Sequence, residues 1–404
     1  MKETRICIVV QGRFHAFALA KALIEKGAPV HVVTNYPAFI AQRFGLPASH
    51  VSGCAPIGLL HRYASRWDLM RRIPALNRAL HQGFSLWAAG HVSKIEPVAV
   101  HVFSGVALEL FERLRAHTNP VLRLLLRGSE HIVDQYIDLE QESLRAGGDI
   151  DKPSQWMVRR ELREYALTDH VVTLSTFARN TFLRRGFAPE KINLLPLATN
   201  VKQFRPAREA VEARLRRIQS DAPLQMLCTG SVSLQKGVLD FVEMARRLRG
   251  RVRFRWVGNV LPDARRFVNA STDIIDFVPR VPENDLPQIY NEADGFVFPT
   301  IQDGFAVVLA QAKAACLPIV ATENSAAPDL LEQGATGWTF PIRRPDLFVE
   351  KMGGWDADRR TMARMVENLW ADETVRDWSD VADDFSAIVK SGMEERAQKG
   401  SWPS

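Results

Sequence analysis

The residues best suited to chemistry lie in one turn, Asp303-Gly304-Phe305-Ala306, and Gln311 follows eight positions after the aspartate. The apolar segment before this turn, 295–299, is typical of a buried strand, and residues 305–315 after it are good helix formers. A helix that begins just after a glycine directs its free N–H groups and positive dipole end toward the turn. An anion such as a diphosphate can therefore bind there. At this spacing Asp303 and Gln311 fall near one face of the helix.

A second loop supplies a positive charge. Segment 224–229 is a predicted strand and 239–248 a predicted helix, and the loop between them ends in Lys236-Gly237. A lysine at a loop tip is often simply solvated. A lysine that follows a strand and precedes a helix is well placed to hold a phosphate, and we predict that Lys236 does so.

These residues resemble the signature of the retaining GT-B glycosyltransferases of family four, the group 1 glycosyltransferases. In that family an acid, Gly-Phe-Gly and a second acid eight positions on bind a sugar nucleotide. A lysine before a glycine holds the diphosphate together with an arginine five residues earlier. In this chain the first acid is shortened to Asp303, the second glycine is Ala306, the second acid is Gln311 and the arginine is Ser231. Glutamine can still hydrogen-bond a ribose hydroxyl, although it accepts less strongly than a carboxylate.

The resemblance covers most of the chain and is specific over 171–206 and 228–341. It implies an α/β protein with the GT-B fold, in which two Rossmann-like domains face a cleft and a C-terminal helix crosses back to the first domain. Ser175 is expected to cap the helix after strand 171–174. We expect an acceptor domain at 1–205, a nucleotide-sugar domain at 206–375, and a crossover helix with a polar tail at 376–404. The tail begins at Ser391 and is expected to be mobile.

The resemblance further implies retaining transfer of a sugar from a nucleoside diphosphate sugar to a hydroxyl acceptor, which could be a glycan, a lipid-linked molecule or a small molecule. Lys236 and the helix N–H groups would stabilise the leaving diphosphate, Asp303 would orient the sugar, and Gln311 would hold the ribose. We expect neither a metal nor a cofactor beyond the donor. The remaining donor-binding residues are expected to be Gly12, Ser231, Arg280, Val281, Gly304, Phe305, Ala306 and Val307.

Candidates in the first domain follow the predicted strands 5–10 and 121–126. Ligand-binding groups in open parallel sheets collect beyond the carboxyl ends of strands. We therefore predict that His131 joins Lys236 and Asp303 in catalysis, and that the acceptor side contains Arg13, His15 and Arg127. Structural interpretations stay open: a βαβ unit needs a glycine turn, a lone histidine is more often structural, and Arg127 could pair with Glu130.

At 404 residues the chain is long enough for two domains, and its 46% hydrophobic and 24% charged residues are ordinary for a globular protein. No segment is typical of a membrane span or signal peptide, so we expect a cytoplasmic protein. Residues 140–153 are polar and contain glycines, which predicts an exposed connection. The four cysteines have no paired spacing and are expected to be reduced, mostly buried thiols: Cys7, Cys54, Cys228 and Cys316.

The net charge of +6 is compatible with a nucleic acid, an anionic membrane or a phosphorylated substrate as partner. Its distribution favours the last two, because segment 62–78 carries five arginines among apolar residues and only one acid. Such a stretch suits a peripheral contact with the inner membrane face, or an acidic acceptor. The alternative is a solvated helix whose apolar face packs on the core.

Three other functions stay open. The altered acids and the missing arginine are compatible with a catalytically silent GT-B protein that only binds a nucleotide sugar. An epimerase would convert the nucleotide sugar without an acceptor, and a phosphorylase would need inorganic phosphate and, commonly, a pyridoxal lysine. The chain lacks the three-glycine fingerprint of nicotinamide enzymes.

Overall fold

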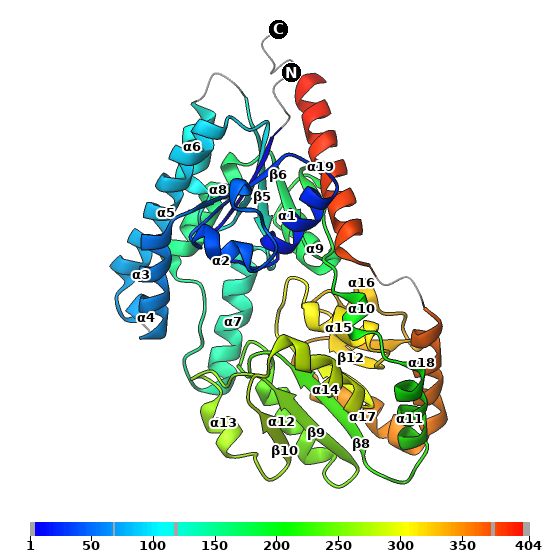
Figure 1. The fold of residues 1–404 in the computed structure, drawn as a ribbon. Helices are drawn as coiled ribbons and strands as arrows, with labels where there is room; N and C mark the ends of the chain where they lie inside the picture. The colour runs from blue at the N-terminus through cyan, green and yellow to red at the C-terminus, as the bar shows by residue number, and fades with distance from the viewer. Residues whose placement is uncertain (1–4, 68, 117–119, 373–375, 399–404) are drawn as a thin grey trace.

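Two parallel β-sheets form the centres of two domains (Figure 1). The computed structural model describes residues 5–67, 69–116, 120–372 and 376–398. The first sheet has seven strands in the order β3-β2-β1-β4-β5-β6-β7. Its strands are β1 (Ile6–Val10), β2 (Val30–Thr34), β3 (Val51–Gly53), β4 (Ala99–Phe103), β5 (Leu122–Arg127), β6 (His170–Thr173) and β7 (Ile192–Leu194).

The second sheet has six strands in the order β10-β9-β8-β11-β12-β13. They are β8 (Leu224–Thr229), β9 (Val252–Val257), β10 (Ile275–Val278), β11 (Gly295–Phe298), β12 (Ile319–Thr322) and β13 (Gly337–Phe340). The central strands are buried on both faces, as β1 and β11 illustrate, because helices cover both sides of each sheet.

Both sheets reverse their strand order at one place, between β1 and β4 in the first and between β8 and β11 in the second. Ligands of open α/β sheets bind beyond the carboxyl ends of the strands at such a switch point. The turns that contain Gly12, Lys236 and Asp303 follow β1, β8 and β11, so the topology brings these predicted residues to the expected edges.

Nine helices belong to the first sheet: α1 (Ala16–Glu25), α2 (Ala38–Gln42), α3 (Ala55–Arg66), α4 (Leu69–Arg72), α5 (Pro74–Ile95), α6 (Leu108–Arg115), α7 (Ile132–Ala146), α8 (Gln155–Leu167) and α9 (Thr176–Arg184), counted among the described residues. The helices that follow β7 are α10 (Val201–Phe204), α11 (Arg208–Ile218), α12 (Val238–Arg247), α13 (Arg265–Asn269), α14 (Leu286–Glu292), α15 (Val307–Ala314), α16 (Ala327–Leu330), α17 (Pro345–Ala357), α18 (Arg359–Ala371) and α19 (Trp378–Gln398). The Ser175 side chain accepts a hydrogen bond from the Ala178 N–H and so caps α9, as predicted.

Helix α19 crosses back to the first domain, as expected from the resemblance (Figure 1). Its buried side chains, among them Phe385 and Val389, join the apolar cluster of the first sheet. The helix extends to Gln398, beyond the predicted end, because Arg396 reaches Asp169 on the first domain at 3.0 Å. The prediction of a polar, mobile tail from residue 391 was therefore wrong over 391–398, and residues 399–404 lie outside the described part.

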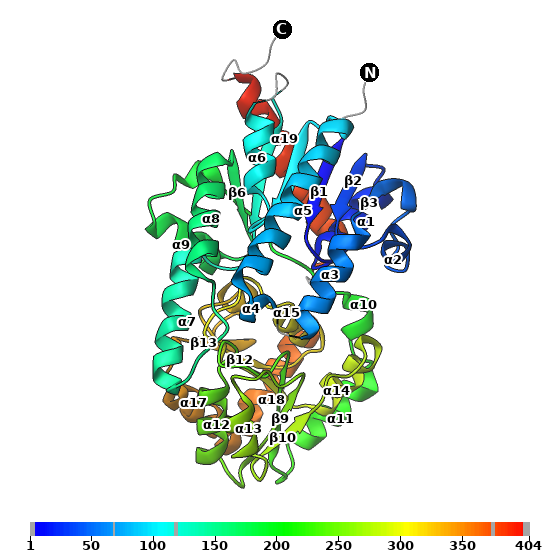
Figure 2. The same cartoon turned by 90° about the vertical axis from the view of Figure 1, so that its left-hand side faces the viewer.

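The predicted exposed connection at 140–153 was wrong in its first half, because α7 continues to Ala146 and runs alongside both domains (Figures 1 and 2). Glu142 on this helix is completely buried. Its carboxylate pairs with Arg145 at 3.2 Å and with Arg343 of the second domain at 2.9 Å. Arg145 also pairs with Asp240 on α12. The polar sequence is typical of a loop because two of the partners that neutralise it, Asp240 and Arg343, lie in distant parts of the chain.

Replacing Arg343 with methionine should lower the free energy of unfolding by about 2 kcal/mol, because a buried carboxylate loses one of its two cationic partners. Urea titration followed by tryptophan fluorescence would measure the loss. Arg344→Met is the matched control, since Arg344 pairs only with Asp346 at the surface and its loss should leave the urea midpoint unchanged. Equal midpoints for the two variants would show that the contact between α7 and Arg343 contributes nothing.

Candidate functional site

The carboxylate of Asp303 lies at the amino end of α15, where two predicted anion-binding groups converge. One of its oxygens accepts hydrogen bonds from the N–H groups of Phe305, at 3.2 Å, and Ala306, at 2.8 Å. The other oxygen pairs with the ammonium group of Lys236. The two residues predicted to act together are therefore in contact. In this structure the aspartate also occupies the amides and the lysine that are expected to bind a diphosphate.

A close backbone approach holds the two loops together. Gly237, which precedes α12, has a φ of +80°, and a Cβ atom there would lie 1.9 Å from the carbonyl oxygen of Pro299 at the end of β11. The Gln235 carbonyl also accepts a hydrogen bond from the Ile301 N–H at 2.8 Å. Only glycine fits at position 237, and its absence of a side chain places Lys236 beside the turn that carries Asp303.

Gln311 is half-buried on α15, and its side chain is hydrogen-bonded by Tyr290. The Tyr290 hydroxyl donates to the Gln311 side-chain oxygen at 3.1 Å and bonds the Thr229 hydroxyl at 2.7 Å. Tyr290 is fully buried, and burial raises the pKa of its phenol, so it remains a neutral donor. Since this bond uses the acceptor of Gln311, its NH₂ group is the part best suited to a ligand. The sequence analysis missed Tyr290, which carries no local motif.

Gly304 and Phe305 form part of the contact between the domains. A Cβ atom on Gly304 would lie 2.0 Å from the carbonyl oxygen of Gly128, in the loop after β5. Beside it the Ser129 hydroxyl bonds the Gln302 side chain. Phe305 is 2% exposed and packs in the apolar cluster of the first sheet. The side chain of Phe305 therefore packs across the interface between the domains, whereas its backbone N–H donates to the Asp303 carboxylate.

On the first domain, the turn after β1 presents an exposed aromatic ring. The Gly12 N–H donates to the Asn35 side chain at 2.8 Å, which fixes the turn. Phe14 follows with a φ of +39° and 69% exposure, and its ring stacks on Phe103 at 5.9 Å between ring centroids. His15 lies against Phe103 at 5.0 Å, and burial lowers the pKa of its imidazole to about 4. The imidazole is therefore neutral at neutral pH.

Arg13 turns away from this ring. Its guanidinium carbon lies 4.3 Å from the centre of the Phe44 ring, just beyond α2. The acceptor-side roles of Arg13 and His15 stay predictions, and Phe14, which was not predicted, lies beside His15 at the same strand end. A non-glycine residue with positive φ and an exposed ring at a strand end was not visible in the sequence.

His131 is buried at the start of α7, where its contacts are structural, and we do not retain it as a catalytic candidate. It is 2% exposed and lies among aromatic rings, 5.1 Å from Tyr165 and 5.0 Å from Phe182 between ring centroids. Its Nδ1 accepts a hydrogen bond from the Val133 N–H at 3.3 Å and so caps α7. Burial lowers the pKa of the imidazole to about 4.

Arg127 is also buried and already paired, so it is not retained on the acceptor side. Its Nε lies 3.2 Å from Glu161 on α8, and its guanidinium donates to Gln135 on α7. The predicted alternative partner was Glu130. Burial, with Asp138 nearby, raises the pKa of the Glu130 carboxyl to about 9, so at neutral pH it provides no full counter-charge.

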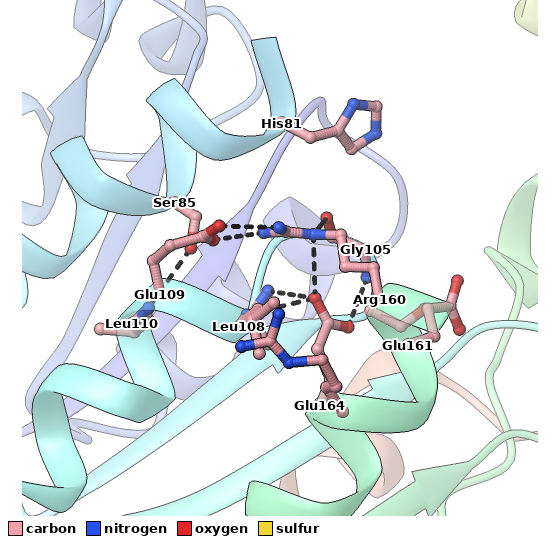
Figure 3. A network of polar contacts seen from close by, with 12 residues as sticks. His81, Ser85, Gly105, Leu108, Glu109, Leu110, Arg160, Glu161 and Glu164 are labelled. Carbon is pink, nitrogen blue, oxygen red and sulfur yellow. Dashed lines mark hydrogen bonds and ion pairs between the residues drawn. The ribbon is translucent and has the colours of Figure 1, made fainter. Parts of the chain in front are cut away.

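A buried network on α8 fixes the loop that follows β4, next to Phe103. Figure 3 shows the Glu164 carboxylate beneath this loop, where it accepts hydrogen bonds from the N–H groups of Gly105 at 2.7 Å and Leu108 at 3.2 Å. Arg160 donates to the Gly105 carbonyl at 2.7 Å and grips Glu109 with both terminal nitrogens. The network holds the carboxyl end of β4 rigid, and it therefore supports the ring on which Phe14 stacks.

The remaining predicted residues lie at the same edge of the second sheet as Lys236. Ser231 is exposed directly after β8, and Arg280 and Val281 follow β10 with exposed and half-buried side chains. Their donor-binding roles stay predictions. A pocket of about 470 Å³ lies elsewhere, between α7, α9 and the segment after β12, where its lining includes Asp138, Arg184 and Asn324 and none of the predicted site residues.

Comparison with known proteins finds similarity that centres on the second domain. Residues 223–355 match the family model described as glycosyl transferases group 1. Over these residues the second domain resembles a group 1 glycosyltransferase domain. Among curated proteins, the chain is 27% identical over 169 residues to the putative colanic acid biosynthesis glycosyltransferase WcaL of Salmonella typhimurium, covering 39% of this chain and 40% of that protein. It is 25% identical over 193 residues to the amylovoran biosynthesis glycosyltransferase AmsK of Erwinia amylovora, covering 44% of this chain and 45% of that protein. The matches thus span less than half the length of these two relatives.

Solved structures show that the whole chain has the GT-B fold. Sucrose-phosphate synthase from Thermosynechococcus elongatus superposes with a TM-score of 0.72 at 19% identity, over 97% of this chain and 100% of that chain. Anabaena HepE in complex with UDP and glucose superposes with a TM-score of 0.66 at 12% identity, over 96% and 100% of the two chains. The predicted fold class and crossover helix are confirmed.

Ala306 stands where the group 1 signature has glycine, and its φ of +61° lies in the left-handed region. Ala306→Gly should therefore stabilise the protein by about 0.5–1 kcal/mol, since relief of strain exceeds the added freedom of the unfolded chain. Urea denaturation would measure this. Ala79→Gly, at an exposed position inside α5, should instead cost about 1 kcal/mol. A loss of stability in Ala306→Gly would mean that the turn is not strained.

Proposed function

We propose that the protein is a retaining, metal-independent glycosyltransferase that moves a sugar from a nucleoside diphosphate sugar to a hydroxyl acceptor. The observation that carries this proposal is the convergence of the Lys236 ammonium and two backbone N–H groups on one carboxylate, that of Asp303. These groups bind an anion in the resting protein, and they sit at the switch point of a group 1 glycosyltransferase domain. The HepE complex with UDP and glucose supports a nucleoside diphosphate as that anion.

In this proposal the donor diphosphate replaces the Asp303 carboxylate at the amino end of α15. The negative charge that develops as the bond from sugar to phosphate breaks is stabilised by Lys236 and by the N–H groups of Phe305 and Ala306. Asp303, released from the amides, then accepts hydrogen bonds from the sugar hydroxyls. The NH₂ group of Gln311, held by Tyr290, donates to the ribose.

The acceptor binds on the first domain, where the Phe14 ring offers an exposed apolar face for a sugar and His15 is neutral. Relatives named for colanic acid and amylovoran biosynthesis favour a glycan or lipid-linked acceptor over a small molecule. Retention follows from the family resemblance, with the donor phosphate receiving the acceptor proton. The four free, buried cysteines fit a reducing compartment, and we propose the cytoplasm, where the protein can approach the inner membrane face.

The silent-binding alternative shares the donor site and lacks only the reaction. No observation favours it, since Asp303 retains a carboxylate within reach of the lysine. Transfer or hydrolysis of a nucleotide sugar at a catalytic rate would exclude it.

Calorimetric titration with UDP, GDP and ADP, each with and without EDTA, tests the donor site. We expect one nucleoside diphosphate to bind independently of EDTA, and Lys236→Ala to weaken it about tenfold or more through loss of a charge-assisted phosphate contact. Lys191→Ala, an exposed lysine on the first domain, should bind as the wild type does. The site is misassigned if no nucleotide binds or if both variants bind equally.

Asp303→Asn should separate binding from reaction. Removing the negative charge frees Lys236 and the amides, so the nucleoside diphosphate should bind about fivefold more tightly. Transfer from the sugar nucleotide should fall, because the neutral amide positions the sugar hydroxyls less well. Weaker binding of the diphosphate would show that the aspartate does not compete for the anion site.

A further inference from the structure

A group of large apolar side chains is exposed on α3 and on the turns that follow it. Leu59, Leu60, Tyr63, Trp67 and Ile73 are between 46% and 66% exposed, and they make up five of the thirteen large apolar side chains that are exposed in the described part of the chain. We refer to these five residues as the α3 surface. Their concentration within fifteen positions of the sequence distinguishes them from scattered exposed residues, which are ordinary.

Core packing does not account for the α3 surface. The inner side of α3 is already occupied: Ala64 is fully buried, and a Cβ atom on Gly58 would lie 2.0 Å from the Asn35 carbonyl at the end of β2. Leu59, Tyr63 and Trp67 follow one another at intervals of four residues on the outer side, and the Trp67 N–H still bonds the Tyr63 carbonyl. The alternative that this stretch buries its apolar face on the core therefore fails for these residues.

Positive charge surrounds the α3 surface. Arg62, Arg72 and Arg78 are exposed, and within the described chain no acid pairs with them. Between residues 55 and 82 the sequence holds five arginines and one acid. Arg66 and Arg71 belong to this stretch, but their side chains lie outside the described residues. An apolar face bordered by exposed arginines complements a bilayer of anionic lipids, whose surface is negative above an apolar interior.

The two exposed aromatic residues fit such a bilayer in detail. The rings of Tyr63 and Trp67 are neighbours, 6.4 Å apart between centroids. Both combine an apolar ring with a polar tip, which is the property that places these residues at the boundary between lipid headgroups and acyl chains. Helices α3 and α4 lie at the end of the first domain that faces the second (Figures 1 and 2).

We propose that the α3 surface docks on an anionic lipid bilayer, with Tyr63 and Trp67 at the headgroup boundary and Arg62, Arg72 and Arg78 against lipid phosphates. Within the described residues no helix is long and apolar enough to cross a bilayer. The proposal goes beyond the donor site, since none of these residues is among the predicted donor-binding residues. It implies that the acceptor is met at the membrane surface.

Sedimentation with vesicles tests the docking. The full chain should bind vesicles of phosphatidylcholine mixed with phosphatidylglycerol at low salt, and pure phosphatidylcholine vesicles only weakly. Arg62→Gln combined with Arg72→Gln should weaken binding about 25-fold, at about fivefold per charge. Leu59→Ser combined with Tyr63→Ser should abolish sedimentation. Leu144→Ser, at an exposed leucine on α7, and Arg249→Gln, at an exposed arginine of the second domain, should sediment as the wild type does.

Fluorescence quenching by brominated phosphatidylglycerol locates the contact. Quenching should occur in the wild type and largely disappear in Trp67→Phe, although eight of the nine tryptophans remain. Every α3 variant should keep the wild-type affinity for the nucleoside diphosphate, so a failure here is distinct from a failure of the donor site. The proposal is overturned if anionic vesicles are not bound, if the α3 and control variants bind equally, or if the α3 variants instead disrupt a dimer.

Discussion

The site depends on one short distance, the approach of the Gly237 backbone to the carbonyl of Pro299. Because no side chain intervenes, the loop after β8 lies directly against the loop after β11, and Lys236 reaches Asp303. The same carboxylate accepts hydrogen bonds from the N–H groups of Phe305 and Ala306 at the start of α15. A lysine, a helix dipole and two amides thus act on one point, and such a point needs an anion. In this structure the anion is supplied by the chain itself, so in the proposed function donor binding is an exchange of one anion for another.

The two domains meet at this same place, which links substrate binding to their arrangement. Gly304 lies against the Gly128 carbonyl, so the turn that carries Asp303 also forms the interface. On the far side α7 runs along both domains and is held there by Arg343. Exchange of the Asp303 carboxylate for a diphosphate would change the charge next to the interface between the domains. Substrate binding in two-domain enzymes commonly causes the domains to close at such an interface. The α3 surface, at the end of the first domain that faces the second, would set the orientation of that interface toward a membrane.

Local patterns predicted the strands and the Ser175 cap, and the family resemblance implied two Rossmann-like domains and assigned Lys236 and Asp303 to one site. The local patterns succeeded because a buried strand, a glycine turn or the start of a helix depends on residues that are neighbours in the sequence. What they missed is nonlocal. Residues 140–146 were predicted as exposed because one of the two arginines that pair with Glu142 lies 201 positions away. His131 was predicted to be catalytic because its burial under Tyr165 and Phe182 cannot be seen in its own segment. Tyr290 was missed for the same reason.

A crystal structure of the protein with the nucleoside diphosphate that binds most tightly would show whether this exchange takes place. The diphosphate should contact the Lys236 ammonium and the N–H groups of Phe305 and Ala306, with the Asp303 carboxylate turned away from those amides. A diphosphate bound elsewhere, for example in the pocket between α7 and α9, with Asp303 still on the amides, would contradict it.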